Sequence, residues 1–204
     1  MKIRVPFYKQ SNNVNCAQFA LKMIFSYFGK NIDLKILDEM MEIQEGKGIS
    51  TIQIAKASAS LGFKTELYSK HISFNPENLD LEFYKKYASN ELEKQSNKWM
   101  KQAKSAGVKF NQKSLPLNKI LQFVKKDKLP IILLDWNVVI GKPHRGYQGH
   151  FVPLVGYDVN NVYVHNQGFH GTKKFMYINR RIFDKARKSP GTDEDFLVIY
   201  KPQQ

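Results

Sequence analysis

Apolar positions along this chain follow a helical period in the first half and a strand-like period in the second. Residues 16–28 carry one charged side chain, Lys22, and lie between Asn15 and Gly29. Asparagine favours the N-cap and glycine the position after a helix, so this pattern predicts a helix buried on nearly every side. Ser50-Thr51-Ile52-Gln53 has the form of a capping box that opens another helix. Further helices are expected at residues 33–44, 116–126 and 180–188.

Short apolar runs bounded by turn residues follow the helices. They predict strands at residues 63–68, 130–136, 150–157, 162–166, 174–178 and 196–200. Helices that precede strands are typical of the α+β class. We therefore expect a two-layer fold in which N-terminal helices pack on a C-terminal antiparallel sheet.

One segment differs in composition from its surroundings. Residues 79–106 are polar and lysine-rich with a partial apolar stripe, and the turn signal Asn75-Pro76 precedes them. We interpret residues 75–111 as a helical insertion in a single domain that spans residues 1–204.

The composition of the chain argues against several classes of protein. The chain has 204 residues, of which 42% are hydrophobic, which is enough for a core. It has no apolar run long enough to span a membrane and no signal peptide at its start, so we expect a cytoplasmic protein without a membrane partner. Its single cysteine excludes an intrachain disulfide and a cysteine-based zinc site. No metal and no organic cofactor is expected.

The formal net charge of +14 attracts anions such as nucleic acid or acidic substrates. However, the lysines are spread along the chain, and no nucleic-acid-binding motif accompanies them. A solvated basic surface is the favoured interpretation, and nucleic-acid binding stays open as an alternative.

The position of Cys16 favours chemistry over packing. A thiol attacks as a thiolate, and the first turn of a helix lowers the pKa of a cysteine because unpaired amides stabilise the anion. Cys16 follows Asn15, the expected N-cap. The alternative is an inert core thiol, the commoner role of a lone cysteine.

A nucleophilic cysteine needs a base and a group that orients the base. His150 opens an apolar strand and Asn166 ends the next one. A hairpin centred on Asp158 sets the two opposite each other, whereas a turn at Asn160-Asn161 requires a β-bulge. The pattern leaves this register open. Gln10 lies shortly before Cys16, and its side-chain amide is the candidate donor for an oxyanion hole.

These residues occur in an order that resembles a known family. Val5-Pro6-Phe7-Tyr8-Lys9-Gln10, Cys16-Ala17, the run from Gly149 to Tyr157 and His165-Asn166 are similar to the bacteriocin-processing cysteine peptidase domain, its stand-alone relatives and the papain-like superfamily. The resemblance covers residues 1–70 and 115–200. It implies a papain-like fold with Gln10 as oxyanion donor, Cys16 as nucleophile, His150 as base and Asn166 as orienting residue.

The chain also departs from that family. Asn15 and Ala17 replace the usual acidic residue and glycine around the cysteine, and Asn166-Gln167 replaces the usual Asp-Pro. Papain itself uses Asn at the third position, so this change is compatible with activity.

The loop at residues 137–149 is expected to form one wall of a substrate cleft, since it is long and leads directly into His150. Its basic residues, Lys142 and Arg145, favour acidic substrates. The expected substrate-binding residues are Trp136, His144, Tyr147 and Gly149. The other histidines, His71, His165 and His170, are expected to be structural or surface residues.

Three functions follow from these observations. The first is a cysteine hydrolase that cleaves a peptide or amide bond through a thioester. The second is an acyltransferase that uses the same triad, which the sequence does not distinguish from the first. The third is a peptide- or nucleic-acid-binding module that retains the fold without catalysis.

Overall fold

The computed structural model describes residues 1–72, 74–88, 91–168 and 171–202. Its helices are α1 (Cys16–Tyr27), α2 (Leu34–Met41), α3 (Thr51–Ser60), α4 (Glu82–Tyr87), α5 (Leu92–Ser105), α6 (Leu117–Leu121), α7 (Trp136–Val139) and α8 (Arg180–Arg187), with 3₁₀ turns η1 (Pro76–Asp80) and η2 (Pro143–Arg145). Its strands are β1 (Thr65–Ser69), β2 (Lys109–Gln112), β3 (Lys128–Asp135), β4 (Gly149–Tyr157), β5 (Asn161–Asn166), β6 (Lys173–Asn179) and β7 (Phe196–Tyr200).

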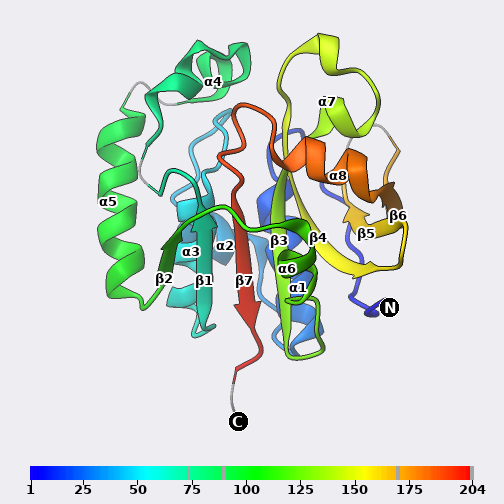
Figure 1. Ribbon diagram of the computed structural model, residues 1–204. Coiled ribbons are helices and arrows are strands. Elements are labelled where there is room, and N and C mark those ends of the chain that lie inside the picture. Colours follow the sequence, from blue (N-terminus) through cyan, green and yellow to red (C-terminus); the bar gives the residue numbers. More distant parts are fainter. Residues whose placement is uncertain (73, 89–90, 169–170, 203–204) are drawn as a thin grey trace.

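The strands form one sheet in the order β2-β1-β7-β3-β4-β5-β6 (Figure 1). Neighbouring strands are antiparallel except β1 and β2, which are parallel. The C-terminal strand β7 lies between β1 and β3, so the last strand of the chain lies inside the sheet and not at its edge. The expected α+β class is confirmed.

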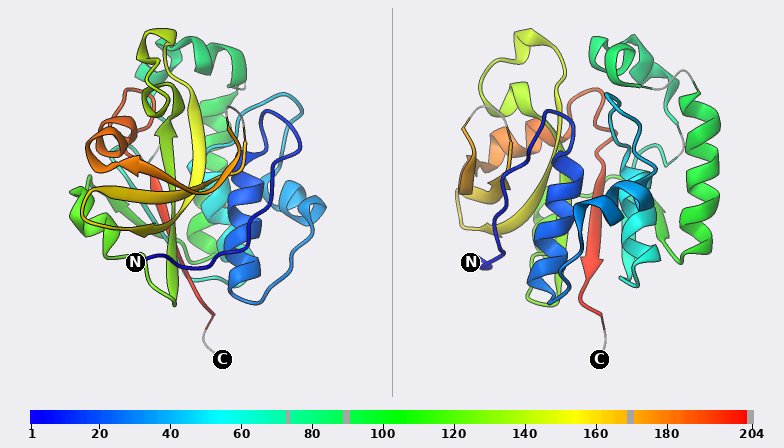
Figure 2. Two further views of the ribbon diagram at one scale, coloured as in Figure 1. Left: turned by 90° about the vertical axis from the view of Figure 1, so that its right-hand side faces the viewer. Right: turned by 180° about the vertical axis from the view of Figure 1, so that it is seen from behind.

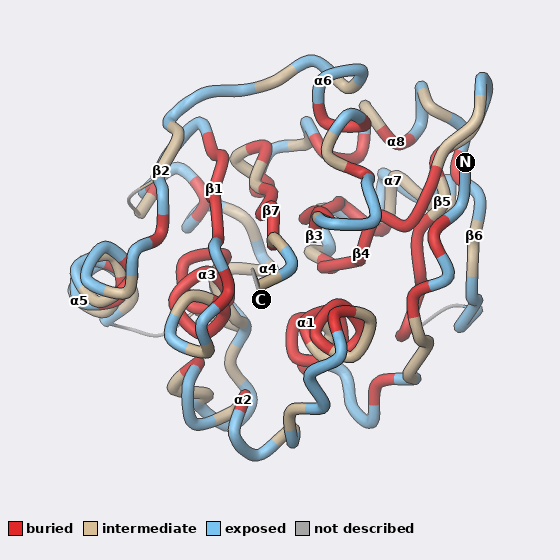
Figure 3. The backbone as a smooth tube through the Cα atoms, turned by 90° about the horizontal axis from the view of Figure 1, so that it is seen from below, coloured by how far each residue is buried: buried red, intermediate tan, exposed pale blue. Residues whose placement is uncertain are grey.

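Helices cover the two faces of the sheet unequally. Helices α1, α2 and α3 lie together on one face, as the view from behind shows (Figure 2). The shorter α6 and α8 lie on the opposite face (Figures 2 and 3). The N-terminal helices therefore form the main covering layer, as expected, and the second face carries a small additional layer.

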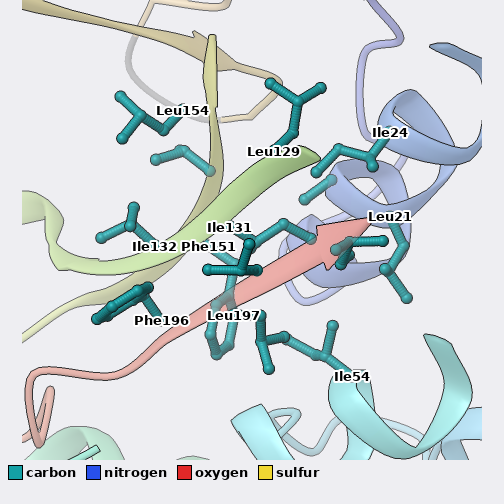
Figure 4. Packing of buried hydrophobic residues seen from close by; sticks show 14 of the residues in the cluster. Leu21, Ile24, Ile54, Leu129, Ile131, Ile132, Phe151, Leu154, Phe196 and Leu197 are labelled. Carbon is teal, nitrogen blue, oxygen red and sulfur yellow. The ribbon is translucent and has the colours of Figure 1, made fainter. Parts of the chain in front are cut away.

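The core lies between α1, α3 and the central strands. Alternation along the strands sends Ile131 and Leu197 toward the helices, where they meet Leu21 and Ile54 (Figure 4). All four side chains are buried. The paired residues Ile132 and Phe196 point to the opposite face. Helix α1 is buried on nearly every side because it lies directly over the sheet, which confirms its prediction from the sequence.

The two predicted helix starts differ in outcome. Ser50 accepts a hydrogen bond from the Gln53 backbone N–H, and the Gln53 side chain accepts one from the Ser50 backbone, so the capping box is present. Asn15 is at the N-cap position of α1, but its side chain makes no capping bond. Its amide instead donates to Ser11 Oγ at 2.8 Å and belongs to the preceding loop.

The segment at residues 75–111 contains η1, α4, α5 and β2. Its helical content is as predicted, but its last residues also extend the sheet, since β2 pairs with β1 from Lys109 to Gln112. That strand was missed because its four residues carry little apolar alternation. That this segment is an insertion in a single domain stays a prediction.

Two further boundaries are corrected. Helix α6 ends at Leu121, five residues before the predicted end, and begins after Pro116. The expected loop at residues 137–149 begins inside α7, whose N-cap Asp135 accepts the Asn137 backbone N–H, and it contains η2. No helix in the described part of the chain is long and apolar enough to cross a membrane.

Helix α8 ends in a buried ion pair that holds the loop before β7. The guanidinium of Arg187 is 2.9 Å from Glu194 and 2.6 Å from Asp184, and only 2% of the arginine is exposed. Lys70 adds a second contact to Glu194. These charges hold the pKa values of both carboxyls below their usual range, although burial opposes the shift.

Replacement of Arg187 is expected to destabilise the protein strongly. Arg187→Ala leaves a buried carboxylate short of its partner, which typically costs about 3–5 kcal/mol of unfolding free energy. Urea denaturation measures this loss. The control Arg181→Ala alters an exposed arginine of the same helix and should stay within about 0.5 kcal/mol of the parent. Equal losses in both variants would contradict the role given to the ion pair.

Candidate active site

Cys16 is the first residue of α1 and is partly exposed. Its thiol receives hydrogen bonds from the backbone N–H groups of Cys16, Ala17 and Phe151. Phe151 directly follows His150 in β4. The start of the helix and the start of this strand therefore meet at the cysteine.

The register of β4 and β5 brings His150 to Asn166. Leu154 pairs with Val164, but Gly156 pairs with Tyr163, so a bulge separates the two pairs. Of the two registers considered from the sequence, the bulged one occurs. His150 Nε2 is 3.1 Å from Asn166 Oδ1.

Hydrogen bonding fixes which nitrogen of His150 carries the proton. An amide oxygen can only accept, so Nε2 donates to Asn166 Oδ1 and Nδ1 keeps a free lone pair in the neutral ring. The orientation of Asn166 is fixed in turn, because its Nδ2 donates to Gly171 O at 2.9 Å. A base with this tautomer can take a proton at Nδ1.

Trp136 packs against the ring of His150. Its ring meets that of His150 edge to face, with centroids 4.6 Å apart at 72°. His150 is 6% exposed and Asn166 fully buried. Trp136 thus lies beside the candidate base.

Gln167 is a site residue that the sequence analysis missed as a contributor. Its Nε2 donates to Cys16 O at 2.9 Å and also to Phe151 O. The side chain is fully buried and therefore joins the start of α1 to β4. Its position directly after Asn166 was the available signal, but only the fold shows which carbonyl groups it reaches.

The side chain of Gln10 lies over Gly168, where any Cβ atom would come within 2.1 Å of Gln10 Oε1. The backbone N–H of Gln10 donates to Gln167 O at 2.9 Å. Its Nε2 donates to Asn12 O at 2.7 Å, and an amide nitrogen has a second hydrogen left to donate. The fold thus brings Gln10 to the chain that carries Asn166 and Gln167.

Electrostatics correct one expectation from the sequence. Burial raises the pKa of the Cys16 thiol, and the backbone hydrogen bonds oppose this effect only in part. Burial also lowers the pKa of His150 to about 4, against the opposing effect of Asn166. The expected lowering of the cysteine pKa is therefore wrong for this structure, and the resting pair is a neutral thiol and a neutral imidazole.

A cavity of about 150 Å³ extends from Cys16 beneath α4. Tyr147 and Gly149, both predicted to contact substrate, line it. His144 lies exposed in η2 and Trp136 is buried under His150, and neither lines the cavity. Lys142 and Arg145 are exposed as well, away from the lining.

The other residues considered from the sequence are two that have structural hydrogen-bond partners, His165 and Asp158, and the histidines His71 and His170. His165 is buried, with Nε2 at 3.1 Å from Val5 O and Nδ1 accepting from the Phe175 backbone N–H. Asp158 accepts the N–H groups of the β4–β5 turn. His71 is exposed, whereas the prediction for His170 falls outside the described residues. Within the described ranges, no group of three His, Cys, Asp or Glu side chains could hold a metal ion.

Comparison with known proteins identifies a family that the sequence analysis did not name. The family described as guanylylate cyclase matches residues 5–199. The chain belongs to the guanylylate cyclase family. Guanylyl cyclase 1 of Arabidopsis thaliana is 26% identical to this family member over 208 residues, which cover 96% of the chain and 75% of the relative.

Solved structures show that this guanylylate cyclase family member has the fold of C39-like peptidase domains. A C39-like peptidase from Bacillus anthracis matches with a TM-score of 0.61 at 14% identity, over 100% of both chains. A double glycine motif protease from an AMS/PCAT transporter, in complex with the leader peptide, matches with a TM-score of 0.53 at 17% identity. The match covers 99% of this chain and 94% of the protease chain. The peptidase domain of Streptococcus ComA matches with a TM-score of 0.52 at 14% identity, over 98% of this chain and 100% of that domain. The resemblance to bacteriocin-processing peptidases is confirmed at the level of the fold.

Cys16 is expected to react slowly with alkylating reagents near neutral pH. A raised thiol pKa lowers the thiolate fraction, so the rate should lie below that of a free thiol at pH 6–8 and keep rising above pH 9. Iodoacetamide kinetics between pH 6 and 10 measure this profile. A rate at pH 6 above that of the free thiol would mean that an ion pair with His150 exists at rest.

Proposed function

We propose that this protein is a cysteine hydrolase that cleaves a peptide or amide bond through a thioester intermediate. The observation that carries the proposal is the bond of 3.1 Å between His150 Nε2 and Asn166 Oδ1, with Trp136 packed edge to face against the His150 ring. It holds the imidazole in the tautomer that a base needs, one residue before Phe151, whose backbone N–H reaches the thiol of the partly exposed Cys16. The C39-like peptidase fold supports the same class of reaction.

The first step joins Cys16 Sγ to the substrate carbonyl carbon while the thiol proton passes to His150 Nδ1. Asn166 Oδ1 stabilises the imidazolium, because it accepts from Nε2–H in both protonation states. The proton then passes to the leaving amine as the C–N bond breaks. Water attacks the thioester with His150 again as base, which releases the acid and restores the thiol.

The negative charge on the substrate oxygen needs donors. The backbone N–H groups at the start of α1 already point at the thiol, and a helix N-terminus favours negative charge. Gln10 is the proposed side-chain donor through the second hydrogen of Nε2. An acyltransferase would use identical chemistry up to the thioester and differ only in the acceptor that replaces water.

A second candidate function comes from the family. Its description is guanylylate cyclase, and the relative from Arabidopsis thaliana carries the name Guanylyl cyclase 1. This function would convert GTP to cyclic GMP and pyrophosphate, by attack of the ribose 3′-oxygen on the α-phosphorus. It makes no use of Cys16 as a nucleophile, so variants of this residue separate the two functions.

The hydrolase requires Cys16, His150 and, to a lesser degree, Asn166. On a substrate found by a peptide-library screen, Cys16→Ala should abolish turnover and His150→Ala should lower kcat by about 10²–10⁴-fold, the usual contribution of a general base. Asn166→Ala should cost less, since its role is to orient the ring. Circular dichroism checks the fold, and Asn161→Ala on the same strand is the control.

Gln10→Ala should lower kcat by about 10²–10³-fold and change KM little, because the oxyanion exists only near the transition state. Full activity in His150→Ala with an intact fold would refute the hydrolase mechanism. Cyclic GMP formed from GTP with Mg²⁺ or Mn²⁺, at equal rates in the parent and Cys16→Ala, would establish the second function instead.

A further inference from the structure

Aromatic side chains of α4 form part of the lining of the cavity beside Cys16. Phe83, Tyr84 and Tyr87 of α4 line it, together with Leu67 of β1 and Leu133 of β3. Tyr84 stacks on Tyr147 with centroids 5.8 Å apart, and Phe83 meets Tyr147 edge to face at 5.1 Å. An aromatic collar of this kind suits the apolar stem of a side chain.

Three contacts hold these aromatic residues of α4 in place. Tyr84 Oη donates to Gly191 O at 2.7 Å, and the backbone N–H of Gly48 donates to Tyr87 O at 2.9 Å. Gly149 permits the third contact, since a Cβ atom there would lie 2.7 Å from the Tyr147 hydroxyl and 3.3 Å from Phe83. Because Gly149 precedes His150, these aromatic residues lie against β4, the strand that carries the candidate base.

The polar part of the cavity lining includes two carboxyl groups beside His71 and uncharged side chains. Asp193 and Asp195 both line it. The carboxylate of Asp193 is occupied, since Asn75 donates to one oxygen at 2.8 Å and Asn78 to the other at 2.7 Å. Amides neutralise no charge, so a negative charge remains in the lining.

Asp195 has unused capacity to bind a donor. Thr51 donates to its Oδ2, whereas its Oδ1 is buried without a hydrogen-bond partner in the part of the chain that the structure describes. The hydroxyl of Ser69 lies close enough to affect the carboxyl, but it donates to His71 O at 2.9 Å. Buried acceptors are normally satisfied, so an empty one in a cavity indicates a missing donor.

The charge of the cavity lining differs from that of the protein as a whole. The protein has a formal net charge of +14, yet no Lys or Arg occurs among the described residues that line this cavity. Burial raises the pKa of Asp195 to about 7, Asp193 adds to the rise, and the hydroxyls of Ser69 and Thr51 oppose it. A cationic group would favour the charged carboxylate and supply the donor that Oδ1 lacks.

We propose that this cavity is the specificity pocket for a basic side chain, lysine- or arginine-like, next to the bond that Cys16 attacks. The apolar stem lies within the collar of Phe83, Tyr84 and Tyr87, which can also attract the cation through their ring faces. The ammonium or guanidinium group pairs with Asp195. This inference rests on the proposed hydrolase function for its place in the reaction, and it reverses the preference for acidic substrates expected from Lys142 and Arg145.

Thiol-reactive probes test the pocket without any turnover. Methanethiosulfonates transfer their thioalkyl group to a cysteine, forming a disulfide and releasing methanesulfinate, and they exist with a cationic aminoethyl or an anionic sulfonatoethyl tail of similar size. Rates at Cys16 are divided by the rates with a free thiol. The parent should prefer the cationic reagent by at least about tenfold, which corresponds to about 1.4 kcal/mol, although the net charge of the protein favours the anionic one.

Asp195→Asn should remove most of this preference, since it keeps the shape and the acceptor for Thr51 but removes the charge. The ratio of two reagents cancels any change in the thiol pKa. The control Asp127→Asn deletes an exposed carboxylate at the far end of β3 and should leave the ratio unchanged. A parent ratio equal to that of the free thiol, or an equal loss in both variants, would overturn the proposal.

Peptide amides provide the second test. Substrates that differ only in the residue before the scissile bond (Lys, Arg, norleucine or Glu) should rank in kcat/KM with Lys and Arg highest, and Asp195→Asn should lower that advantage at least about tenfold. If the probe ratio holds but no peptide is cleaved in a manner that depends on Cys16, the hydrolase proposal fails and the cation pocket stands. If cleavage occurs without a basic preference, the pocket proposal fails alone.

Discussion

The hydrogen bonds of Gln167 join the two parts of the chain on which the site depends. Cys16 lies at the start of α1, more than a hundred residues before His150 in β4, and the buried Gln167 amide donates to Cys16 O and to Phe151 O. Loss of a buried partner leaves acceptors unsatisfied, so the cost of separating α1 from β4 is high. The bond between His150 and Asn166 and the N–H of Phe151 at the thiol lie next to this junction.

Burial at this junction has a chemical consequence. The same dry environment that fixes His150 and Asn166 disfavours an isolated thiolate and an isolated imidazolium. In the proposed hydrolase, proton transfer would therefore accompany attack instead of preceding it.

Family and fold point in different chemical directions. The guanylylate cyclase family match covers nearly the whole chain, whereas the fold is that of C39-like peptidases. A shared fold supports many activities, and a site has to be judged by its own groups. In this chain those groups are a thiol, an imidazole in a fixed tautomer, an orienting amide, and beside them a cavity with negative charge in a strongly positive protein.

The sequence by itself determined the features that depend on local spacing. The apolar helix after Asn15, the capping box at Ser50 and the succession of strands after Pro130 were all visible, because short-range periodicity suffices for them. The functional roles of Gln10, Cys16, His150 and Asn166 stay a prediction. These features were enough to predict the α+β class and the resemblance to a peptidase fold.

Only the tertiary structure decided what depends on contacts between distant segments. The bulge between Leu154 and Gly156 sets the register of His150 and Asn166, and burial rather than the helix terminus dominates the pKa of Cys16. Likewise, Asp195 and the aromatic residues of α4 line one cavity although more than a hundred positions separate them in the sequence. Register, desolvation and cavity shape are properties of the packed chain, since each is set by atoms that the sequence places far apart.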